Sequence, residues 1–329
     1  MRRALSVFWT AALPLAALVL LPVQLRADAY LSEDKVYYGA DSYTVDYDKE
    51  IVHAKGRAFF RKGDRSVFSD RIVIYYGKQE KRALFYDNVI VKDMKSGYTI
   101  TGERAEARFG QDYYRIEGNS MFEDEARSVR SSVIELSAEG DLLFSGGVRY
   151  SDARYEVGAP LLRLREGSAQ FEKGSGEAVE ALEKESGDRI YCDSLRFDER
   201  SGDLIFSGDV LFFQGDKERK ASPNKSASLE KSGSPKNSAS LFVIRAEEIR
   251  YLREGDTFYI SGNVYLSDGS LSLGAPEAEY SRTEGVLTVR GGATMREGAR
   301  TVSSASMRIE LDTKRLIFFD EAKGVFGAP

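Results

Sequence analysis

The sequence is poor in the residues that most enzymes use for catalysis. Among its 329 residues there is one cysteine, Cys192, and one histidine, His53. A lone cysteine cannot form a disulfide within the chain, and a lone histidine removes most zinc sites and most catalytic triads. The patterns of phosphate-binding loops, nucleophile elbows and calcium loops are also missing. We therefore expect no catalytic residues, no metal and no cofactor, and we interpret the protein as a non-enzyme.

The chain also lacks an excess of basic charge. It has 47 Lys plus Arg against 52 Asp plus Glu, which gives a formal net charge of −5. This balance argues against a nucleic acid as partner. Proline is rare, with 7 residues, whereas there are 30 glycines, 18 tyrosines and 18 phenylalanines. Such a composition favours β-strands joined by many turns.

One long apolar run lies at the N-terminus. It extends from Ala4 to Leu25 behind Arg2 and Arg3, and Ala27-Asp28-Ala29 has the small-x-small pattern of a cleavage site. Residues 1–29 are therefore predicted to be a signal peptide that exports the protein. Because the run is longer than most such segments, an uncleaved N-terminal anchor in the inner membrane is the alternative.

A unit of about 30 residues repeats along the remaining chain, and the segment "AEEIRYLREGDTFYISGNVYL" from Ala246 illustrates it. Each unit begins with a small residue, followed three and five positions later by apolar residues or alanine. A polar turn follows, and then a second alternating strand that contains Gly or Asp. The second half of the fifth unit, "SAQFEKGSGEAV", is polar. The nine units start at Ala40, Ser69, Gly102, Ser131, Ala159, Cys192, Ala246, Ala275 and Ser304.

The Gly or Asp inside each second strand predicts a kink. Alternation with a period of two continues in phase through this position, so a bend or bulge is favoured over a hairpin turn. Gly, Asn and Asp best tolerate left-handed backbone, which indicates that the position requires a conformation. A bend at the same place in every unit predicts an all-β fold: an elongated, slightly twisted, two-walled stack of about nine two-strand repeats.

Residues 214–240 interrupt the repeat. This segment is rich in Ser and Lys and has almost no apolar residues, so it is predicted to be a disordered insertion. The rest of the span 30–329 is expected to form one repeat domain.

The repeated phrases "SGDV" and "SGNV", with "ITGERAEARF" and "FVIRAEEIRY" after the kinked strand, resemble the OstA-like (LptA-type) lipopolysaccharide-transport proteins. The resemblance covers roughly residues 36–326. It implies an open β-jellyroll in the periplasm whose apolar interior carries acyl chains between the inner and outer membranes. It also implies edge-to-edge, head-to-tail self-association and, as partners, an inner-membrane export complex and an outer-membrane translocon.

Strand alternation then identifies which side chains would contact the lipid, because successive residues point to opposite faces. Those on the side of the kink residue are expected to line the groove for lipopolysaccharide or a related lipid. They are Val52, Ile72, Ile74, Phe85, Val89, Ile116, Ile134, Leu136, Phe144, Val148, Leu195, Phe197, Phe206, Val210, Ile249, Ile260, Val264, Val289, Ile309 and Phe318.

Two other functions fit the same repeat. A structural or adhesive β-solenoid would fill its interior with interlocking side chains and hold no ligand. A solenoid polysaccharide hydrolase would use a pair of carboxylates, although the sequence marks no particular pair.

Overall fold

The computed structural model describes residues 36–77, 81–215, 243–310, 313, 315–320 and 322–326. The predicted signal peptide, residues 1–29, and all but two residues of the predicted insertion at 214–240 lie outside this range. Within it the protein is built from strands, and it contains no helix that could span a membrane.

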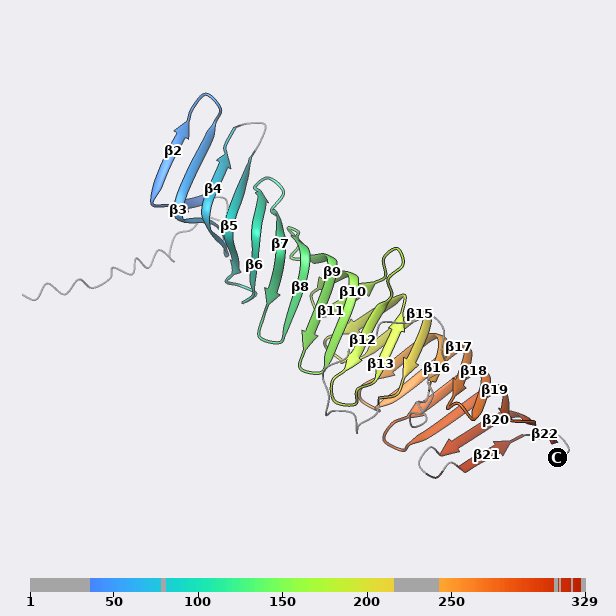
Figure 1. Ribbon diagram of the computed structural model, residues 1–329. Helices are drawn as coiled ribbons and strands as arrows, with labels where there is room; N and C mark the ends of the chain where they lie inside the picture. Colours follow the sequence, from blue (N-terminus) through green and yellow to red (C-terminus); the bar gives the residue numbers. More distant parts are fainter. Residues whose placement is uncertain are drawn as a thin grey trace, which may run out of the picture.

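The strands follow one another along an elongated, twisted stack (Figure 1). The first part holds β1 (Val36–Gly39), β2 (Ser42–Asp46), β3 (Ile51–Lys62), β4 (Arg65–Tyr75), β5 (Arg82–Asp93), β6 (Thr99–Arg108), β7 (Tyr113–Glu123), β8 (Arg127–Leu136) and β9 (Leu142–Asp152). The middle holds β10 (Tyr155–Arg165), β11 (Ser168–Glu172), β12 (Val179–Glu183), β13 (Arg189–Cys192), β14 (Ser194–Asp198) and β15 (Leu204–Phe213). The last part holds β16 (Val243–Leu252), β17 (Thr257–Ser267), β18 (Leu271–Ser281), β19 (Val286–Glu297), β20 (Arg300–Glu310), β21 (Arg315–Phe319) and β22 (Lys323–Phe326).

All described strands belong to one antiparallel sheet, in which most pair with their neighbours in the chain. The exceptions are places where a long strand lies against two short ones. Strand β10 pairs with β11 and β12, and β15 pairs with β13 and β14. At the ends, β3 pairs with β1 and β2, and β20 with β21 and β22. Beside the insertion, Phe213 of β15 pairs with Val243 of β16, so these two strands remain direct neighbours.

The predicted kink is a β-bulge in the middle of a continuous strand. In β17, Gly262 has a φ of 77° and Asn263 a φ of 50°, both left-handed. Pairing with β18 passes from Ser261 to Val264 on one side and from Glu277 to Ala275 on the other, so two residues oppose one. The alternative of a hairpin turn at the glycine is therefore wrong. The same pair of left-handed residues occurs at Gly56 and Arg57, Asp87 and Asn88, Gly118 and Asn119, Gly146 and Gly147, Gly208 and Asp209, and Gly291 and Gly292. The prediction of a kink in every unit is wrong for the fifth unit, where Gly174 is not left-handed and the strand breaks between Glu172 and Val179.

A hydrogen bond on the outside of the bulge holds several of these kinks. Asn263 Nδ2 donates to Glu247 Oε1 at 2.6 Å, and Asn88 Nδ2 donates to Asp70 Oδ2 at 2.8 Å. The acceptor is in each case the residue directly after the small residue that opens the repeat unit. The left-handed glycine is also required for space, because a Cβ on Gly262 would lie 2.6 Å from the Glu247 side chain.

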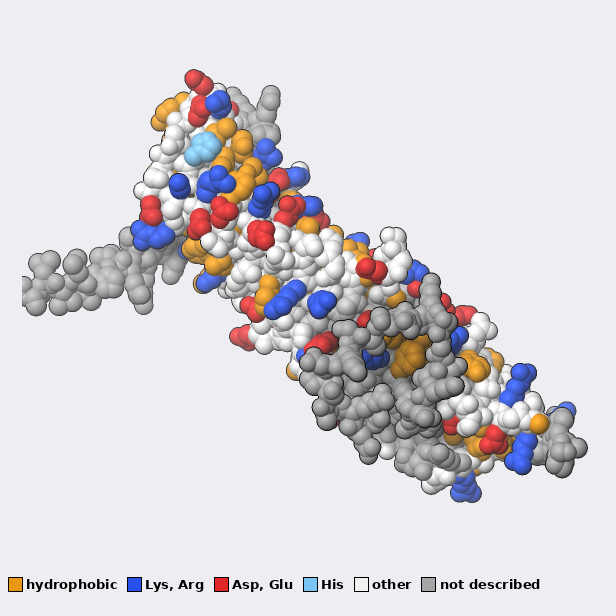
Figure 2. All heavy atoms as spheres, viewed as in Figure 1, with side chains coloured by type: hydrophobic (Ala, Val, Ile, Leu, Met, Phe, Trp, Pro, Cys, Tyr) orange, Lys and Arg blue, Asp and Glu red, His pale blue; other side chains and the backbone are white. Residues whose placement is uncertain are grey.

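The bulges divide the sheet into two walls. The strands β3, β5, β7, β9, β15, β17 and β19 each contain a bulge. The part of each strand before its bulge, together with the strand segment paired to that part, belongs to what we call the first wall. The part after the bulge, with the segment paired to it, belongs to the second wall. The apolar faces of both walls form one continuous core. Edge-to-face aromatic pairs occur within it, such as Phe60 with Phe85 and Phe122 with Phe144. Charged side chains lie on the outer surface along the length of the stack (Figure 2).

Candidate functional site

The residues that were predicted to line the groove all belong to this common core. Phe197 and Phe318 are partly buried and pack against it, and every other member of the predicted set is at most 6% exposed. Register explains their grouping, because Ile134 pairs with Ile116 on one side and with Phe144 on the other. The alternation of the sequence therefore identifies the interior face, and in most of the stack that interior is filled by side chains.

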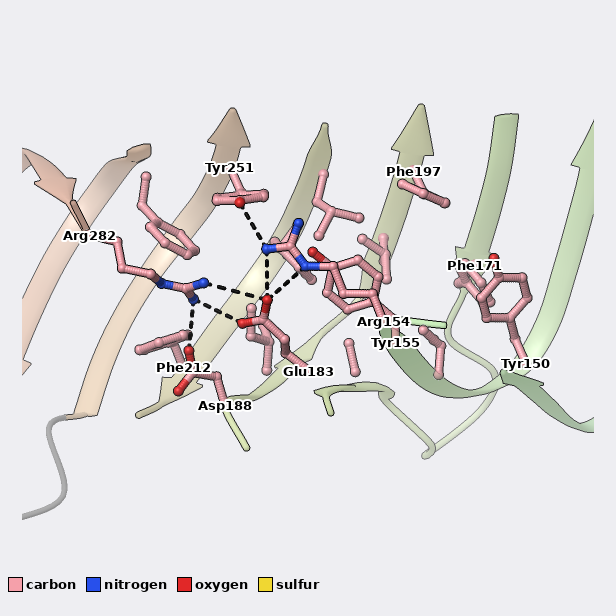
Figure 3. A pocket seen from close by; sticks show the side chains of 17 residues that line it. Tyr150, Arg154, Tyr155, Phe171, Glu183, Asp188, Phe197, Phe212, Tyr251 and Arg282 are labelled. Atoms are coloured by element: carbon pink, nitrogen blue, oxygen red, sulfur yellow. Dashed lines mark hydrogen bonds and ion pairs between the residues drawn. The ribbon is translucent and has the colours of Figure 1, made fainter. Parts of the chain in front are cut away.

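The interior opens in the middle of the stack, where the strands are short. A pocket there encloses about 520 Å³ of space, counting its mouth and the open solvent in it. Figure 3 shows its aromatic rings and the charged groups at one side. Leu195, Phe197 and Phe206 of the predicted set contribute to it. The other apolar lining residues are Tyr150, Tyr155, Val157, Phe171, Ala181, Ile190, Leu204, Phe212, Tyr251 and Phe258.

Four charged side chains lie together at this pocket: Arg154, Glu183, Asp188 and Arg282 (Figure 3). Arg282 donates from one terminal nitrogen to Glu183 Oε2 at 3.0 Å and to Asp188 Oδ2 at 2.9 Å. From the other side, Arg154 Nε donates to Glu183 Oε1 at 2.8 Å. Glu183 thus lies between two guanidinium groups, and we call these four residues the ion cluster.

Tyr251 of the first wall is hydrogen-bonded to the ion cluster. Arg154 donates to its hydroxyl oxygen at 2.9 Å, and that hydroxyl donates to Asp256 Oδ1 at 3.0 Å. The guanidinium of Arg154 also lies 5.2 Å from the centre of the Tyr251 ring, and that of Arg282 lies 5.1 Å from the Phe258 ring. Cation–π contacts of this kind hold both arginines against the apolar lining of the pocket.

Local turns fix the members of the ion cluster. Asp152 accepts from the backbone nitrogens of Arg154 and Tyr155, at 2.7 and 2.6 Å, which closes the turn between β9 and β10. In the loop after β12 the backbone nitrogen of Glu183 donates to the carbonyl of Asp188 at 2.9 Å. Ser186 Oγ donates to Glu183 Oε2 at 2.8 Å and so helps to orient the carboxylate.

Glu183 and the arginines that contact it are ionised at neutral pH. Burial disfavours the charged form of Glu183, but the hydrogen bonds from Ser186, Arg282 and Arg154 outweigh it, so the pKa of the carboxyl lies below its ordinary value. Burial also opposes the charge of Arg282, yet Glu183, Asp188 and Asp256 raise the pKa of its guanidinium. Both arginines therefore remain cations in contact with a carboxylate at physiological pH.

A second depression lies on the outer side of the same side chains. It measures about 1280 Å³, open solvent included, and is lined by polar and charged residues such as Glu185, Arg253 and Asp256. Arg154, Glu183, Asp188 and Arg282 line both this depression and the apolar pocket. The ion cluster therefore separates an apolar interior from a polar exterior.

The ion cluster was not predicted from the sequence. Arg154, Glu183 and Arg282 are in turns or at strand ends, where charged residues are ordinary. Glu183 and Arg282 are 99 residues apart, and no local pattern connects them. The available signal was the polar second half of the fifth unit, residues 168–179, which coincides with the interruption of the strands.

Two further observations concern reactive groups of the described residues. Cys192 is buried, and burial raises the pKa of its thiol to about 12, which suppresses the reactive thiolate. Across the described ranges no three His, Cys, Asp or Glu side chains are arranged so that they could hold a metal ion.

Part of the chain matches a known protein family. Residues 39–141 match the family model described as LptA/(LptD N-terminal domain) LPS transport protein. Over these residues the chain is similar to the LptA/LptD N-terminal family. It is a family of transport proteins. The matched region ends at residue 141, directly before β9. All the residues that line the pocket, the ion cluster included, lie beyond the matched region.

A solved structure is also similar to the chain. It is LptH, described as the LptA homologous periplasmic component of the conserved lipopolysaccharide transport device from Pseudomonas aeruginosa. The alignment covers 61% of this chain and 96% of that chain at 7% sequence identity, with a TM-score of 0.17. That score is too low for the likeness to support an argument. No curated protein matches the chain in sequence.

Proposed function

We propose that the protein is a periplasmic carrier that shields the acyl chains of lipopolysaccharide, or of a related amphipathic lipid, between its two walls. The observation that carries this proposal is the continuous apolar core, which opens into an apolar pocket in the middle of the stack. Each methylene group kept out of water contributes about 0.8 kcal/mol, so such an interior favours long acyl chains. The match of residues 39–141 to a family of transport proteins supports the same function.

The ends of the sheet supply surfaces for the partners of such a carrier. In the described part of the chain β2 pairs with β3 alone, and β21 pairs with β20 alone. Unpaired strand edges accept further strands. We therefore infer head-to-tail self-association, and contact with an inner-membrane export complex and an outer-membrane translocon. Such a row of molecules would form a bridge between the two membranes.

A structural β-solenoid without ligand is the second candidate. It is favoured by the tight filling of the interior away from the pocket, where residues such as Ile72, Ile116 and Ile134 are fully buried. In the carrier, acyl chains would enter where the interior is already open and would separate the walls as they advance.

Photo-crosslinking in cells distinguishes the two candidates. Phe206 faces the interior and borders the pocket, whereas its neighbour Ile205 is on the opposite face of β15 and is half-buried. Both side chains are large and apolar, so crosslinking residues placed at 205 and at 206 differ only in the face of the strand to which they point. The carrier predicts capture of lipid at 206 and little at 205, and mass spectrometry of the adduct identifies the lipid. A folded protein that captures no lipid at either position would support the solenoid.

A further inference from the structure

The two walls meet along a line that we call the seam, where the turns at their outer ends approach one another. Phe60 of the second wall stacks on Phe109 of the first, with ring centres 5.0 Å apart. Near the same place Lys62 Nζ donates to Asp112 Oδ1 at 3.1 Å. Farther along, Arg127 at the start of β8 forms an ion pair with Glu199, in the turn before β15. Charged pairs therefore close the seam at several points.

The ion cluster is the most extensive of these contacts. Arg154, Asp188 and Glu183, the last residue of β12, lie at the turns and strand ends of the second wall. Tyr251, in β16, and Arg282, directly after β18, lie on the first wall. Every hydrogen bond from Arg282 to Glu183 or Asp188, and the bond from Arg154 to Tyr251, therefore crosses the seam. The seam is closed by the Lys62–Asp112 pair, the Arg127–Glu199 pair and the ion cluster. Of these three contacts, the ion cluster is the one that has the apolar pocket on its inner side and the polar depression on its outer side.

The geometry of the cluster indicates what could open it. Glu183 accepts hydrogen bonds from both guanidinium groups, one from each wall. A phosphate group is an equally good or better partner for paired arginines, because it presents more acceptor oxygens and more charge. The Glu183 carboxylate is 8% exposed where it lies, and it would regain water once the walls part.

We propose that the ion cluster is an entry port for an acyl lipid with a phosphate-bearing head. The phosphate takes the place of Glu183 on Arg154 and Arg282, the head occupies the outer depression, and the acyl chain enters the apolar pocket. This inference rests on the proposed carrier function and adds to it a position of entry and a chemical class of head group.

Matched lipid probes test the port. Fluorescent phosphatidate and fluorescent diacylglycerol with identical acyl chains are offered to the full chain from vesicles of phosphatidylcholine. Uptake is measured by fluorescence and by crosslinking to a photo-reactive residue at Phe206, which reports entry into the interior. We expect the unmodified protein to take up phosphatidate at least tenfold more readily than diacylglycerol. Inorganic phosphate at millimolar concentration tests whether a free anion is the ligand, and we expect it not to compete.

The decisive variant is Arg154→Gln/Arg282→Gln. It removes both charges from the port, so uptake of phosphatidate should fall to the level of diacylglycerol, whose own uptake should stay unchanged or rise. Arg127→Gln is the matched control, because it breaks another ion pair across the seam that lines neither the pocket nor the depression. This control should keep the preference for phosphatidate. Thermal melting of each variant establishes that it is folded.

The outcomes separate this inference from the proposed function. Uptake of both probes without any preference, or a preference that survives in the double variant, would overturn the port and leave the carrier in place. Equal loss in the Arg127→Gln control would show that seam closure in general, and not the cluster, sets the preference. Competition by inorganic phosphate would assign the arginines to a free anion and would also overturn the port. Failure of the unmodified protein to take up either probe would refute the carrier itself.

Discussion

The interior of the stack is packed differently in two regions, the regular rungs, by which we mean the long strands β3–β9 and β16–β20, and the interrupted middle, β11–β14. From β3 to β9 and from β16 to β20, each strand runs through both walls, and the interior side chains fill the space between them. From β11 to β14 the strands are half as long and belong to one wall each. The core continues through both regions, yet the pocket and the ion cluster occur in the interrupted one.

The difference arises in the fifth repeat unit. Its polar segment at 168–179 has too few apolar residues to continue as one alternating strand, and its Gly174 is not in the left-handed conformation of the other kinks. The chain instead breaks between Glu172 and Val179. Each wall then has its own short strands, and the side chains from the two walls no longer interdigitate fully. A local loss of periodicity therefore creates the site.

The largest effect should come from placing a charge inside a regular rung. Ile260 is 2% exposed, whereas its neighbour Tyr259 is 44% exposed on the opposite face of β17. Ile260→Asp should lower the free energy of unfolding by about 5 kcal/mol, because a carboxylate would be buried without a partner. Tyr259→Asp should change it by less than about 1 kcal/mol. Urea denaturation followed by circular dichroism measures both, and similar losses for the two variants would contradict the assignment of faces.

Removing a ring compares the two regions directly. Phe144 is fully buried and packs edge to face on Phe122, so Phe144→Ala should cost about 4 kcal/mol. Phe206 borders the pocket and already has empty space on one side, so Phe206→Ala should cost less, about 3 kcal/mol. The same denaturation experiment gives the order of the two losses. The reverse order would show that the pocket region is packed as tightly as the regular rungs.

The ion cluster should make the stability of the middle region depend on pH. Because the pKa of Glu183 is depressed in the folded protein, its contribution is complete above its unfolded pKa of about 4.3 and is lost as the pH falls through the folded value. Glu183→Gln should therefore lower the free energy of unfolding by about 1–2 kcal/mol at pH 7, since the arginines are partly exposed. Melting temperatures from pH 3 to pH 7 test this. The gap between the variant and the unmodified protein should narrow below about pH 4.3, and a gap that widens would exclude an ionised Glu183.

The smallest effect should come from the bulges, which are a property of the regular rungs. Asn263→Ala removes the hydrogen bond to Glu247 and leaves alanine in left-handed backbone, which should cost about 1 kcal/mol. Asn263→Gly loses the same hydrogen bond without the backbone strain and should be milder. Thermal melting compares them. Equal losses in the two variants would show that the hydrogen bond, and not the backbone conformation, is what the position requires.

The sequence predicted the rungs well because both of its signals are local. A period of two identifies the buried face of a strand, and a recurring Gly, Asn or Asp identifies left-handed backbone. The placement of Val89, Phe144 and Val264 in the interior follows from these two rules. The same rules identify an interior without telling whether it is full or hollow, because hollowness depends on how far apart the two walls stand.

The sequence by itself determined the repeat, the position of each bulge and the side of each strand that faces inward, since these depend on residues within a few positions of one another. The tertiary structure alone decided which turns meet across the seam. Lys62 meets Asp112 at a distance of 50 residues, whereas Glu183 meets Arg282 at 99. The number of residues between two partners across the seam depends on the twist accumulated along the stack and on where the strands break. It therefore required the whole fold to bring Arg154 and Arg282 to either side of one carboxylate.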